Sequence, residues 1–488
     1  MNEIISAING LVWSKALIAL CLGAGLYFSV RTRFMQVRAI PEMLRCIFSG
    51  KTSPSGVSSF QALTMSLSGR VGTGNIAGVA TAIAFGGPGA VFWMWTVAFF
   101  GASTAFVEAT LAQIYKERDD KGMYRGGPAY YIEKGIGLKW YAWLFAVATI
   151  VATGFLLPGV QANSIGAAME TAWGIKPAIT AACVVAGLGF IIFGGVKRIA
   201  HFAEFVVPFM ALAYIIIALY IMFLNFDQVP AVFSLIIKSA FGLQAGFGAV
   251  LGLAVEWGVK RGVYSNEAGQ GTAPHPAAAA EVTHPAKQGY VQAFSIYIDT
   301  MLVRSATAFL ILSTGMYNVF NPEGGMLVEK LPGMEVGPGY AQAAVESMLP
   351  GFGQGFVALA LLFFAFTTIV AYYYMAETNI SYINRRIHRP WIVLALRLGI
   401  LLMVTIGTLK TAGAAWQLGD IGAGLMAWLN IIAILILQKP AFAALRDYEK
   451  QRKAGILEPS FDPDALGISN AGFWTDKLRE EAKPRGNP

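Results

Sequence analysis

The stretch SLSGRVGTGNIAGVATAIAFGG (residues 66–87) decides the fold. A helix needs about 20 apolar residues to cross a bilayer, and this stretch is long enough. Gly69, Gly72, Gly74 and Gly78 nevertheless fall within one helix length. Each glycine costs about 1 kcal/mol of helix propensity relative to alanine. The series therefore indicates either a close-packed seam of small residues or a helix that unwinds in mid-membrane.

Asn75 stands between two of these glycine steps and favours the second interpretation. Unpaired backbone groups at membrane depth are tolerated only where they line a cavity or a ligand. A polar side chain at the same depth is a functional candidate in its own right. We therefore expect the segment around Asn75 to be an unwound helix that lines a binding site.

The composition points to an all-α, polytopic membrane protein. Of the 488 residues 56% are hydrophobic and 13% charged, whereas soluble domains carry roughly 25% charged residues. The net charge of +8 comes from Lys and Arg in short loops, without a basic stripe, which argues against a nucleic-acid partner. Three cysteines lie far apart and have no metal-ligand spacing, so neither a disulfide framework nor a zinc site is expected.

Apolar runs of bilayer length predict about eleven membrane-spanning helices. The runs lie at approximately residues 11–30, 60–84, 89–114, 140–163, 177–194, 201–224, 241–259, 289–316, 352–382, 391–410 and 414–437.

Basic loops alternate with neutral or acidic ones along the chain, with Lys260 and Arg261 counted as charges of a cytoplasmic loop. The alternation places the N-terminus outside and the C-terminus in the cytoplasm. Residues 1–445 form the predicted membrane domain, and residues 446–488 read as a polar cytoplasmic tail. The long loop 317–351 is expected to hold a short helix near residues 340–348.

A second glycine-rich run, GLQAGFGAVLG (residues 242–252), interrupts the seventh span. With the helix at 11–30 set aside as an extra one, the two interrupted spans are the first and sixth of ten. They correspond in two five-helix halves, about 60–224 and about 241–437, and five is odd, so the halves are inverted. This five-plus-five arrangement is typical of secondary transporters with a site at the bilayer midplane.

Other polar residues inside the spans extend the candidate site. Thr367 and Thr368 are adjacent hydroxyls that suit a hard cation such as Na⁺, although bonding to their own helix explains them equally well. Asp299 is the most deeply placed carboxylate. Arg304 follows about one and a half turns later, so the two form a candidate coupling pair. Gln161 follows a Pro-Gly step near the end of the fourth span.

Several classes of protein are disfavoured by missing motifs. The sequence has no phosphate loop, no zinc motif and no nucleophile motif of a hydrolase, so we expect no enzyme activity. His275 and His284 are expected to be solvated loop residues. A channel remains an alternative, but it needs a continuous polar pore, and the spans show isolated polar points. A membrane-embedded enzyme would need a nucleophile–base pair or metal set, which the sequence does not display.

Four blocks resemble those of a known family. They are SGRVGTGNIAGVATAI (68–83), GGPGAVFWMWTVAFFG (86–101), RGGPAYYIEKG (125–135) and GVKRGVYSNEAGQGTAP (258–274). The blocks resemble conserved segments of the alanine/glycine:cation symporters, the sodium:alanine symporter family. The resemblance covers nearly the whole chain in the right order.

The resemblance implies a fold of the amino acid–polyamine–organocation type in a bacterial cytoplasmic membrane. It also implies import of L-alanine, D-alanine or glycine with Na⁺, or with H⁺ in some members. The implied partners are a small amino acid and the lipid bilayer; the oligomeric state stays open, with a monomer plausible. The implied substrate-binding residues are Gly72, Thr73, Gly74, Asn75, Gln161, Phe247, Thr368 and Tyr372.

The same resemblance implies a Na⁺ site made of the Thr367 and Thr368 hydroxyls with carbonyls between Gly69 and Gly72. Two positions depart from the family pattern. Tyr372 stands where the family usually has tryptophan, which implies a slightly larger or more polar substrate space. Arg304 stands where the family often has cysteine, which places a cation near Asp299.

Overall fold

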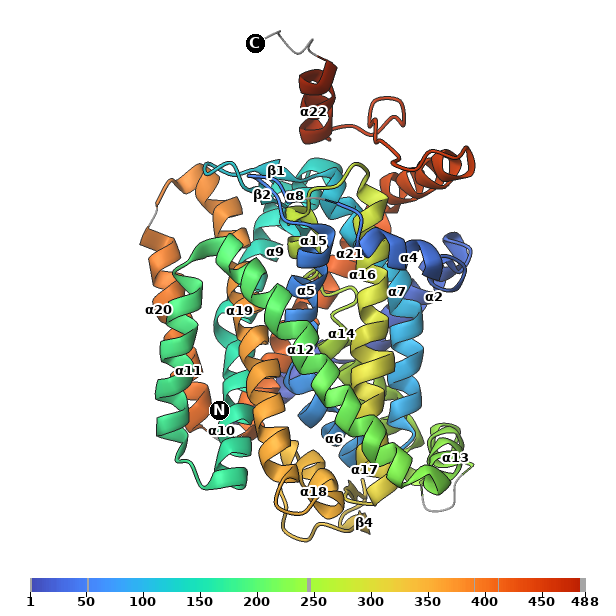
Figure 1. Ribbon diagram of the computed structural model, residues 1–488, viewed down its shortest axis with the longest axis vertical. Coiled ribbons are helices and arrows are strands. Elements are labelled where there is room, and N and C mark those ends of the chain that lie inside the picture. Colours follow the sequence, from blue (N-terminus) through green and yellow to red (C-terminus); the bar gives the residue numbers. More distant parts are fainter. Residues whose placement is uncertain (1, 51, 244–246, 390, 411, 483–488) are drawn as a thin grey trace.

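Long helices run side by side through most of the molecule, and the computed structural model describes residues 2–50, 52–243, 247–389, 391–410 and 412–482 (Figure 1). The first half contains α1 (Asn2–Val12), α2 (Lys15–Arg31), α3 (Met35–Arg38), α4 (Ile40–Ile47), α5 (Ser59–Arg70), α6 (Thr73–Gly86), α7 (Ala90–Ile114), β1 (Glu117–Arg118), β2 (Tyr124–Arg125), α8 (Pro128–Tyr131), η1 (Ile132–Ile136), α9 (Lys139–Val151), η2 (Ala152–Leu156), α10 (Leu157–Trp173), α11 (Pro177–Ile192) and α12 (Gly195–Leu224).

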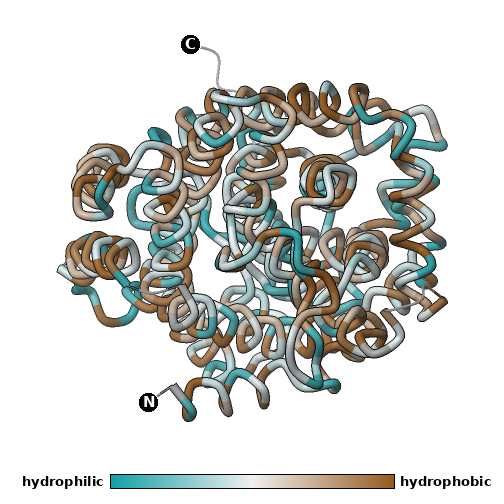
Figure 2. The backbone as a smooth tube through the Cα atoms, turned by 90° about the horizontal axis from the view of Figure 1, so that it is seen from below, coloured by the Kyte–Doolittle hydropathy of each residue, from teal (hydrophilic) through white to brown (hydrophobic). Residues whose placement is uncertain are grey.

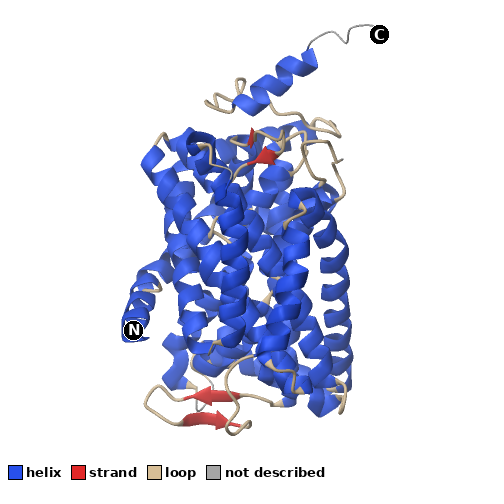
Figure 3. Cartoon of the chain, turned by 90° about the vertical axis from the view of Figure 1, so that its left-hand side faces the viewer, coloured by secondary structure: helices blue, strands red, loops and turns tan. Residues whose placement is uncertain are grey.

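The second half contains η3 (Phe226–Gln228), α13 (Val229–Ala240), η4 (Gly248–Val250), α14 (Leu251–Asn266), α15 (Pro274–Ala279), α16 (Pro285–Ile296), η5 (Tyr297–Arg304), α17 (Ser305–Thr314), β3 (Asn318–Phe320), β4 (Met326–Glu329), α18 (Pro338–Met348), α19 (Gly353–Ile387), α20 (Trp391–Leu409), α21 (Ala412–Lys453) and α22 (Gly472–Ala482). The two strand pairs are short hairpins at opposite ends of the helices (Figure 3). The helix predicted within the loop 317–351 is confirmed as α18.

Eight helical stretches among the described residues are long and apolar enough to cross a membrane. They are Glu3–Arg31, Ala90–Ile114, Lys139–Trp173, Gly195–Leu224, Pro285–Thr314, Gly353–Ile387, Trp391–Leu409 and Ala415–Lys453. The other three predicted spans are α11, which has 16 residues, and the two glycine-interrupted segments. The chain is thus a mostly helical, multi-spanning membrane protein, while the number eleven stays a prediction.

The distribution of side chains is inverted relative to a soluble protein. Helix α12 exposes Phe205, Phe209 and Phe223 by 71–79% of their surface, whereas Asn75 and Asp299 are fully buried. Large exposed apolar residues are expected where the solvent is lipid, and polar groups then gather inside. Figure 2, which looks along many of the helices, shows how much of their length is hydrophobic.

The first predicted helix interruption is confirmed between α5 and α6. Helix α5 ends at Arg70, and α6 begins at Thr73. Between them Val71 and Gly72 leave the helical conformation, with Gly72 extended at φ −136° and ψ −152°. The glycine-rich sequence breaks at this point because glycine loses little by leaving the helix.

The main interruption of the second segment lies elsewhere than predicted. The prediction placed it at residues 242–252; that region is irregular before α14, and Gln244 and Gly246 lie outside the described residues. A further break follows α14, where Glu267 (φ 56°), Gly269 (φ 84°) and Gly271 (φ 81°) adopt left-handed conformations. The chain turns there into the short helix α15.

Helices α6 and α14 lie against each other in opposite directions. The Cα of Gly74 faces Ser265 so closely that an added Cβ would lie 2.9 Å from the Ser265 Cβ. At the other end of α6, Gly86 is packed in the same way against Leu253 and Trp257. The break at residues 71–72 and the break after Asn266 therefore lie at the same level of the bundle.

The structure corrects the placement of Lys260 and Arg261. Both lie within α14 and are buried, rather than in a loop. The Lys260 Nζ and the Arg261 Nη2 lie 2.9 and 2.7 Å from one oxygen of Asp420 on α21. A buried charge needs a partner, and Asp420 supplies it from a segment about 160 residues away, which no local pattern reveals.

The prediction of solvated histidines is also wrong. His275 and His284 are both fully buried. A ring nitrogen of His275 lies 2.8 Å from the Asn379 side chain, and one of His284 lies 3.2 Å from Asp447. Polar partners from α19 and α21 make this burial possible.

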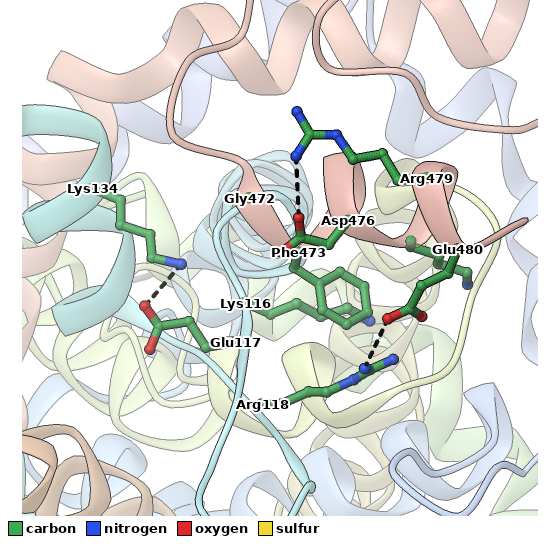
Figure 4. A pocket seen from close by; sticks show the side chains of 10 residues that line it. Lys116, Glu117, Arg118, Lys134, Gly472, Phe473, Asp476, Arg479 and Glu480 are labelled. Carbon is green, nitrogen blue, oxygen red and sulfur yellow. Dashed lines mark ion pairs between the residues drawn. The ribbon is translucent and has the colours of Figure 1, made fainter. Parts of the chain in front are cut away.

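The segment after α21 returns to the end of the bundle that carries β1 and β2, and α22 stands above that end (Figure 1). Helix α21 continues past residue 445 to Lys453. The buried Trp474 donates its indole N–H to the Gln113 carbonyl at 2.8 Å, and Lys477 lies 2.9 Å from Glu281. Figure 4 shows the adjoining pocket of about 560 Å³, which is lined by mutually paired charges between α22 and β1. Its charged, paired lining does not suit the small neutral substrate implied by the sequence.

Candidate functional site

The N-terminus of α6 is the centre of the candidate site. The Gly72 N–H donates to the Asn75 side-chain oxygen, and the Thr73 N–H donates to the Gln161 side-chain oxygen, both at 3.0 Å. Free N–H groups at a helix start attract anionic groups, because the helix dipole adds to their partial positive charge. Neutral amide oxygens accept from two of these N–H groups. A carboxylate can displace those oxygens favourably.

Helices α10 and α19 close tightly on the break through Gly72. A Cβ on this residue would lie 2.4 Å from the Thr368 hydroxyl oxygen and 3.0 Å from the Gln161 side-chain oxygen. The Tyr372 hydroxyl lies near the Gln161 side chain. The Tyr264 hydroxyl is buried without a hydrogen-bond partner among the described residues. The structure therefore places Gly72, Thr73, Gln161, Thr368 and Tyr372 close together, while their role in substrate binding stays a prediction.

The two threonines of the predicted Na⁺ site point in different directions. The Thr368 hydroxyl lies 2.7 Å from the Ser68 carbonyl in the last turn of α5, besides bonding to its own helix. The Thr367 hydroxyl bonds to the Phe364 carbonyl of its own helix and contacts the sulfur of Met210 on α12. Of the pair, Thr368 faces the break and Thr367 faces away from it.

Asp299 is tied to the same break from a wide π-helical turn, η5. One carboxylate oxygen accepts from the Asn75 amide at 2.7 Å and from the Ser265 hydroxyl at 3.1 Å. The other oxygen accepts from the Thr300 hydroxyl at 2.7 Å. Ser265 also reaches the Arg70 carbonyl at 3.2 Å. A buried carboxylate is stable only with such bonds, so this cluster joins α5, α6, α14 and η5 at one point.

The predicted pairing of Asp299 with Arg304 is not found. Arg304 is buried, and its guanidinium approaches the carbonyls of Gly262 and Gly74 at 3.4 and 3.5 Å. These described residues form no Asp299–Arg304 ion pair within 4.0 Å. Hydroxyl and amide donors saturate the carboxylate, and the π turn carries Arg304 toward the α6–α14 interface instead.

Phe247 does not join the site. It precedes α14 and packs against Gly87 at the far end of α6. Gly87 lies twelve residues from Asn75, which along a helix is about 18 Å. The structure instead supplies Ser265 and Thr300, which the sequence analysis missed. The signal for Ser265 was present in the glycines of SNEAGQG (residues 265–271), which follow a helix as those of the first break do.

Comparison with known proteins identifies the family of this chain. A model of the sodium:alanine symporter family matches residues 1–463. The chain is 61% identical over 483 residues to the putative sodium/proton-dependent alanine carrier protein YrbD of Bacillus subtilis, covering 99% of both chains. It is 54% identical over 447 residues to the sodium/proton-dependent alanine carrier protein of Bacillus sp. PS3, covering 91% of this chain and 99% of the relative.

A further relative is named for a different substrate. The probable sodium/glutamine symporter GlnT of Bacillus subtilis is 43% identical over 472 residues, which is 96% of this chain and 95% of the relative. These matches cover 91–99% of this chain, and together with its long apolar helices they identify a multi-spanning membrane carrier. The chain belongs to the sodium:alanine symporter family.

Proposed function

We propose that this protein imports a small neutral amino acid (alanine, D-alanine or glycine) together with Na⁺, or H⁺ in its place, by alternating access. The observation that carries the proposal is the start of α6, where two backbone amides are held by the exchangeable side chains of Asn75 and Gln161. A site of this kind recognises a carboxylate without a basic side chain.

The substrate's carboxylate takes over the Thr73 N–H from Gln161. The released Gln161 side-chain oxygen then accepts from the substrate's ammonium group. Tyr372 lies near Gln161 and limits the space for the substrate's side chain. One methyl group is worth only about 1–3 kcal/mol in such a pocket, so alanine and glycine are both accepted, and larger residues are excluded by clash.

The coupling Na⁺ binds between α5 and α19. The Ser68 carbonyl and the Thr368 hydroxyl already lie 2.7 Å apart there, and oxygen ligands of this type suit a hard cation. Carbonyls from Gly69 to Gly72 complete the proposed site. The ion binds more tightly to the conformation in which α5 and α19 are held together. This difference in ion affinity between the conformations couples ion binding to transport.

The proposed architecture follows from the same interruptions. Ten of eleven spans form two inverted halves of five, and the helix at residues 11–30 is extra. The antiparallel contact of α6 and α14, with a break at the same level in each segment, supports the inverted relation. We place the protein in the bacterial cytoplasmic membrane with its N-terminus outside and residues 446–488 inside.

Uptake by proteoliposomes tests this function. Purified protein should accumulate radiolabelled L-alanine when an inward Na⁺ gradient is imposed, and unlabelled glycine and D-alanine should compete. Unlabelled glutamine should also be tested as a competitor, because one relative is named as a probable sodium/glutamine symporter. Uptake that ignores both the Na⁺ gradient and pH would contradict symport, and flux that never saturates would indicate a channel.

The two threonines should differ in their effect on ion dependence. Thr368→Ala removes the hydroxyl beside the Ser68 carbonyl, so the Na⁺ concentration for half-maximal uptake should rise about tenfold or more, which is the effect of losing about 1.4 kcal/mol. Thr367→Ala, the matched control, should leave it within about twofold because its hydroxyl faces α12. Equal effects of the two substitutions would remove the proposed ion site.

A further inference from the structure

A cavity of about 440 Å³ lies beside α6 on the side of the break away from α22. It is formed by α1, α6, α14 and α21, and its lining includes Asn9, Thr81, Trp257, Arg261, Trp416 and Asp420. Thr81 follows Asn75 by six residues, a rise of about 9 Å along α6. The cavity therefore lies in line with the candidate site, about two helical turns away from it.

The charges in this cavity are incompletely paired. Lys260 and Arg261 both bind the same oxygen of Asp420, at 2.9 and 2.7 Å. The other Asp420 oxygen and the Arg261 Nε and Nη1 groups are buried without a hydrogen-bond partner. Glu256 also lines the cavity, so two cations face two carboxylates, but unused donors of Arg261 and an unused acceptor of Asp420 remain. Such a set is complementary to a zwitterion.

Aromatic rings hold the Arg261 guanidinium in place. Its central carbon lies 4.6 Å from the ring centre of Trp416, 5.2 Å from that of Trp257 and 5.4 Å from that of Tyr264. Rings at these distances stabilise the cation and fix its plane. A fixed guanidinium edge binds a carboxylate with less loss of side-chain entropy.

Arg261 also separates the cavity from the candidate site. It precedes Ser265 of the Asp299 cluster by one helical turn, and the ring of Tyr264 packs against its guanidinium. Its Cδ lies 4.0 Å from the position of a Cβ on Gly78, one turn beyond Asn75 on α6. Arg261 therefore lies between the level of the cavity and the level of Asn75.

We propose that the cavity is a second binding site for a small zwitterionic amino acid on the path to the site at Asn75. The carboxylate of the amino acid binds the free Nε and Nη1 donors of Arg261. Its ammonium group binds the free oxygen of Asp420 and the carboxylate of Glu256, which also lines the cavity. This inference rests on the proposed function, since it takes the transported amino acid as the ligand.

Binding stoichiometry tests the proposal. Equilibrium dialysis of the purified full-length protein with radiolabelled L-alanine at saturating Na⁺ should give two alanine molecules per protein. Arg261→Gln should lose one, because Lys260 still holds Asp420 while the guanidinium donors are gone. Asn75→Ala should lose the alanine bound at the Asn75 site and keep the alanine bound in the cavity. The control Arg198→Gln changes an exposed arginine on α12 and should keep both.

The outcomes separate this proposal from the proposed function. If the wild-type protein binds no alanine, the proposed function itself is contradicted. If it binds a single alanine molecule, only the second site is overturned. If Arg261→Gln binds nothing, Asn75→Ala decides: one retained molecule supports the second site, and none overturns it. Unchanged binding by Arg261→Gln also overturns the assignment.

Discussion

Gly72→Ala should reduce Na⁺-driven alanine uptake by about 100-fold or more. The new Cβ would lie 2.4 Å from the Thr368 hydroxyl oxygen and 3.0 Å from the Gln161 side-chain oxygen, so the break, α10 and α19 must separate. Thr368 would lose its position beside Ser68, and Gln161 would lose the Thr73 amide. Displacements of about 1 Å at a binding site can cost about 100-fold in rate.

Gly78→Ala is the matched control for this substitution. It makes the same change on the same helix, but the nearest neighbours of its Cβ would lie at 3.9 and 4.0 Å, which is ordinary contact. Alanine is also the better helix former by about 1 kcal/mol. Uptake by Gly78→Ala should stay near that of the wild type, measured at equal reconstituted protein. If Gly72→Ala took up alanine as well as the wild type, the closed packing at the break would not be needed for transport.

Asp299→Asn should also nearly abolish uptake. The carboxylate accepts bonds from Asn75, Ser265 and Thr300, and an asparagine of the same shape turns one acceptor into a donor facing other donors. A buried donor or acceptor without a partner costs about 1–3 kcal/mol, and two are created here. Asn75 then loses the orientation in which it caps Gly72. We expect loss of alanine binding by at least about tenfold, together with loss of uptake.

Binding and uptake measured in parallel check this result. Asp227→Asn, in the short turn η3 between α12 and α13, makes the same chemical change at an exposed position and should alter neither. Thr300→Ala removes one of the three donors and should have an intermediate effect. Wild-type uptake by Asp299→Asn would mean that the polar cluster contributes nothing to transport.

The first interruption could be predicted from the sequence because its cause is local. Glycines at 69, 72, 74 and 78 weaken the helix wherever it lies, and Asn75 marks the polar side of the break. The second break was misplaced because an apolar-run template ends at the first charges, Lys260 and Arg261. Those charges are buried through Asp420, so α14 continues to Asn266.

The roles of the acidic and hydroxyl residues needed three-dimensional contacts. Asp299 was singled out by its depth in the sequence, but its partners come from α6 and α14, and Arg304 faces elsewhere. Thr367 and Thr368 are adjacent residues of the same type, so the sequence does not distinguish them. In a helix their side chains point about 100° apart. Only the packing of α5 and α12 against α19 determines which hydroxyl meets the break.

The π turn at η5 gives the helix that carries Asp299 one surplus residue. A π turn bonds each residue to the fifth one along rather than the fourth, so it holds more chain than an α turn of the same length. Residues past such a surplus are turned by about 100° relative to their places in an unbroken α-helix. The π turn, and not the register of α16 alone, therefore sets the direction in which Asp299 meets Asn75 and Ser265.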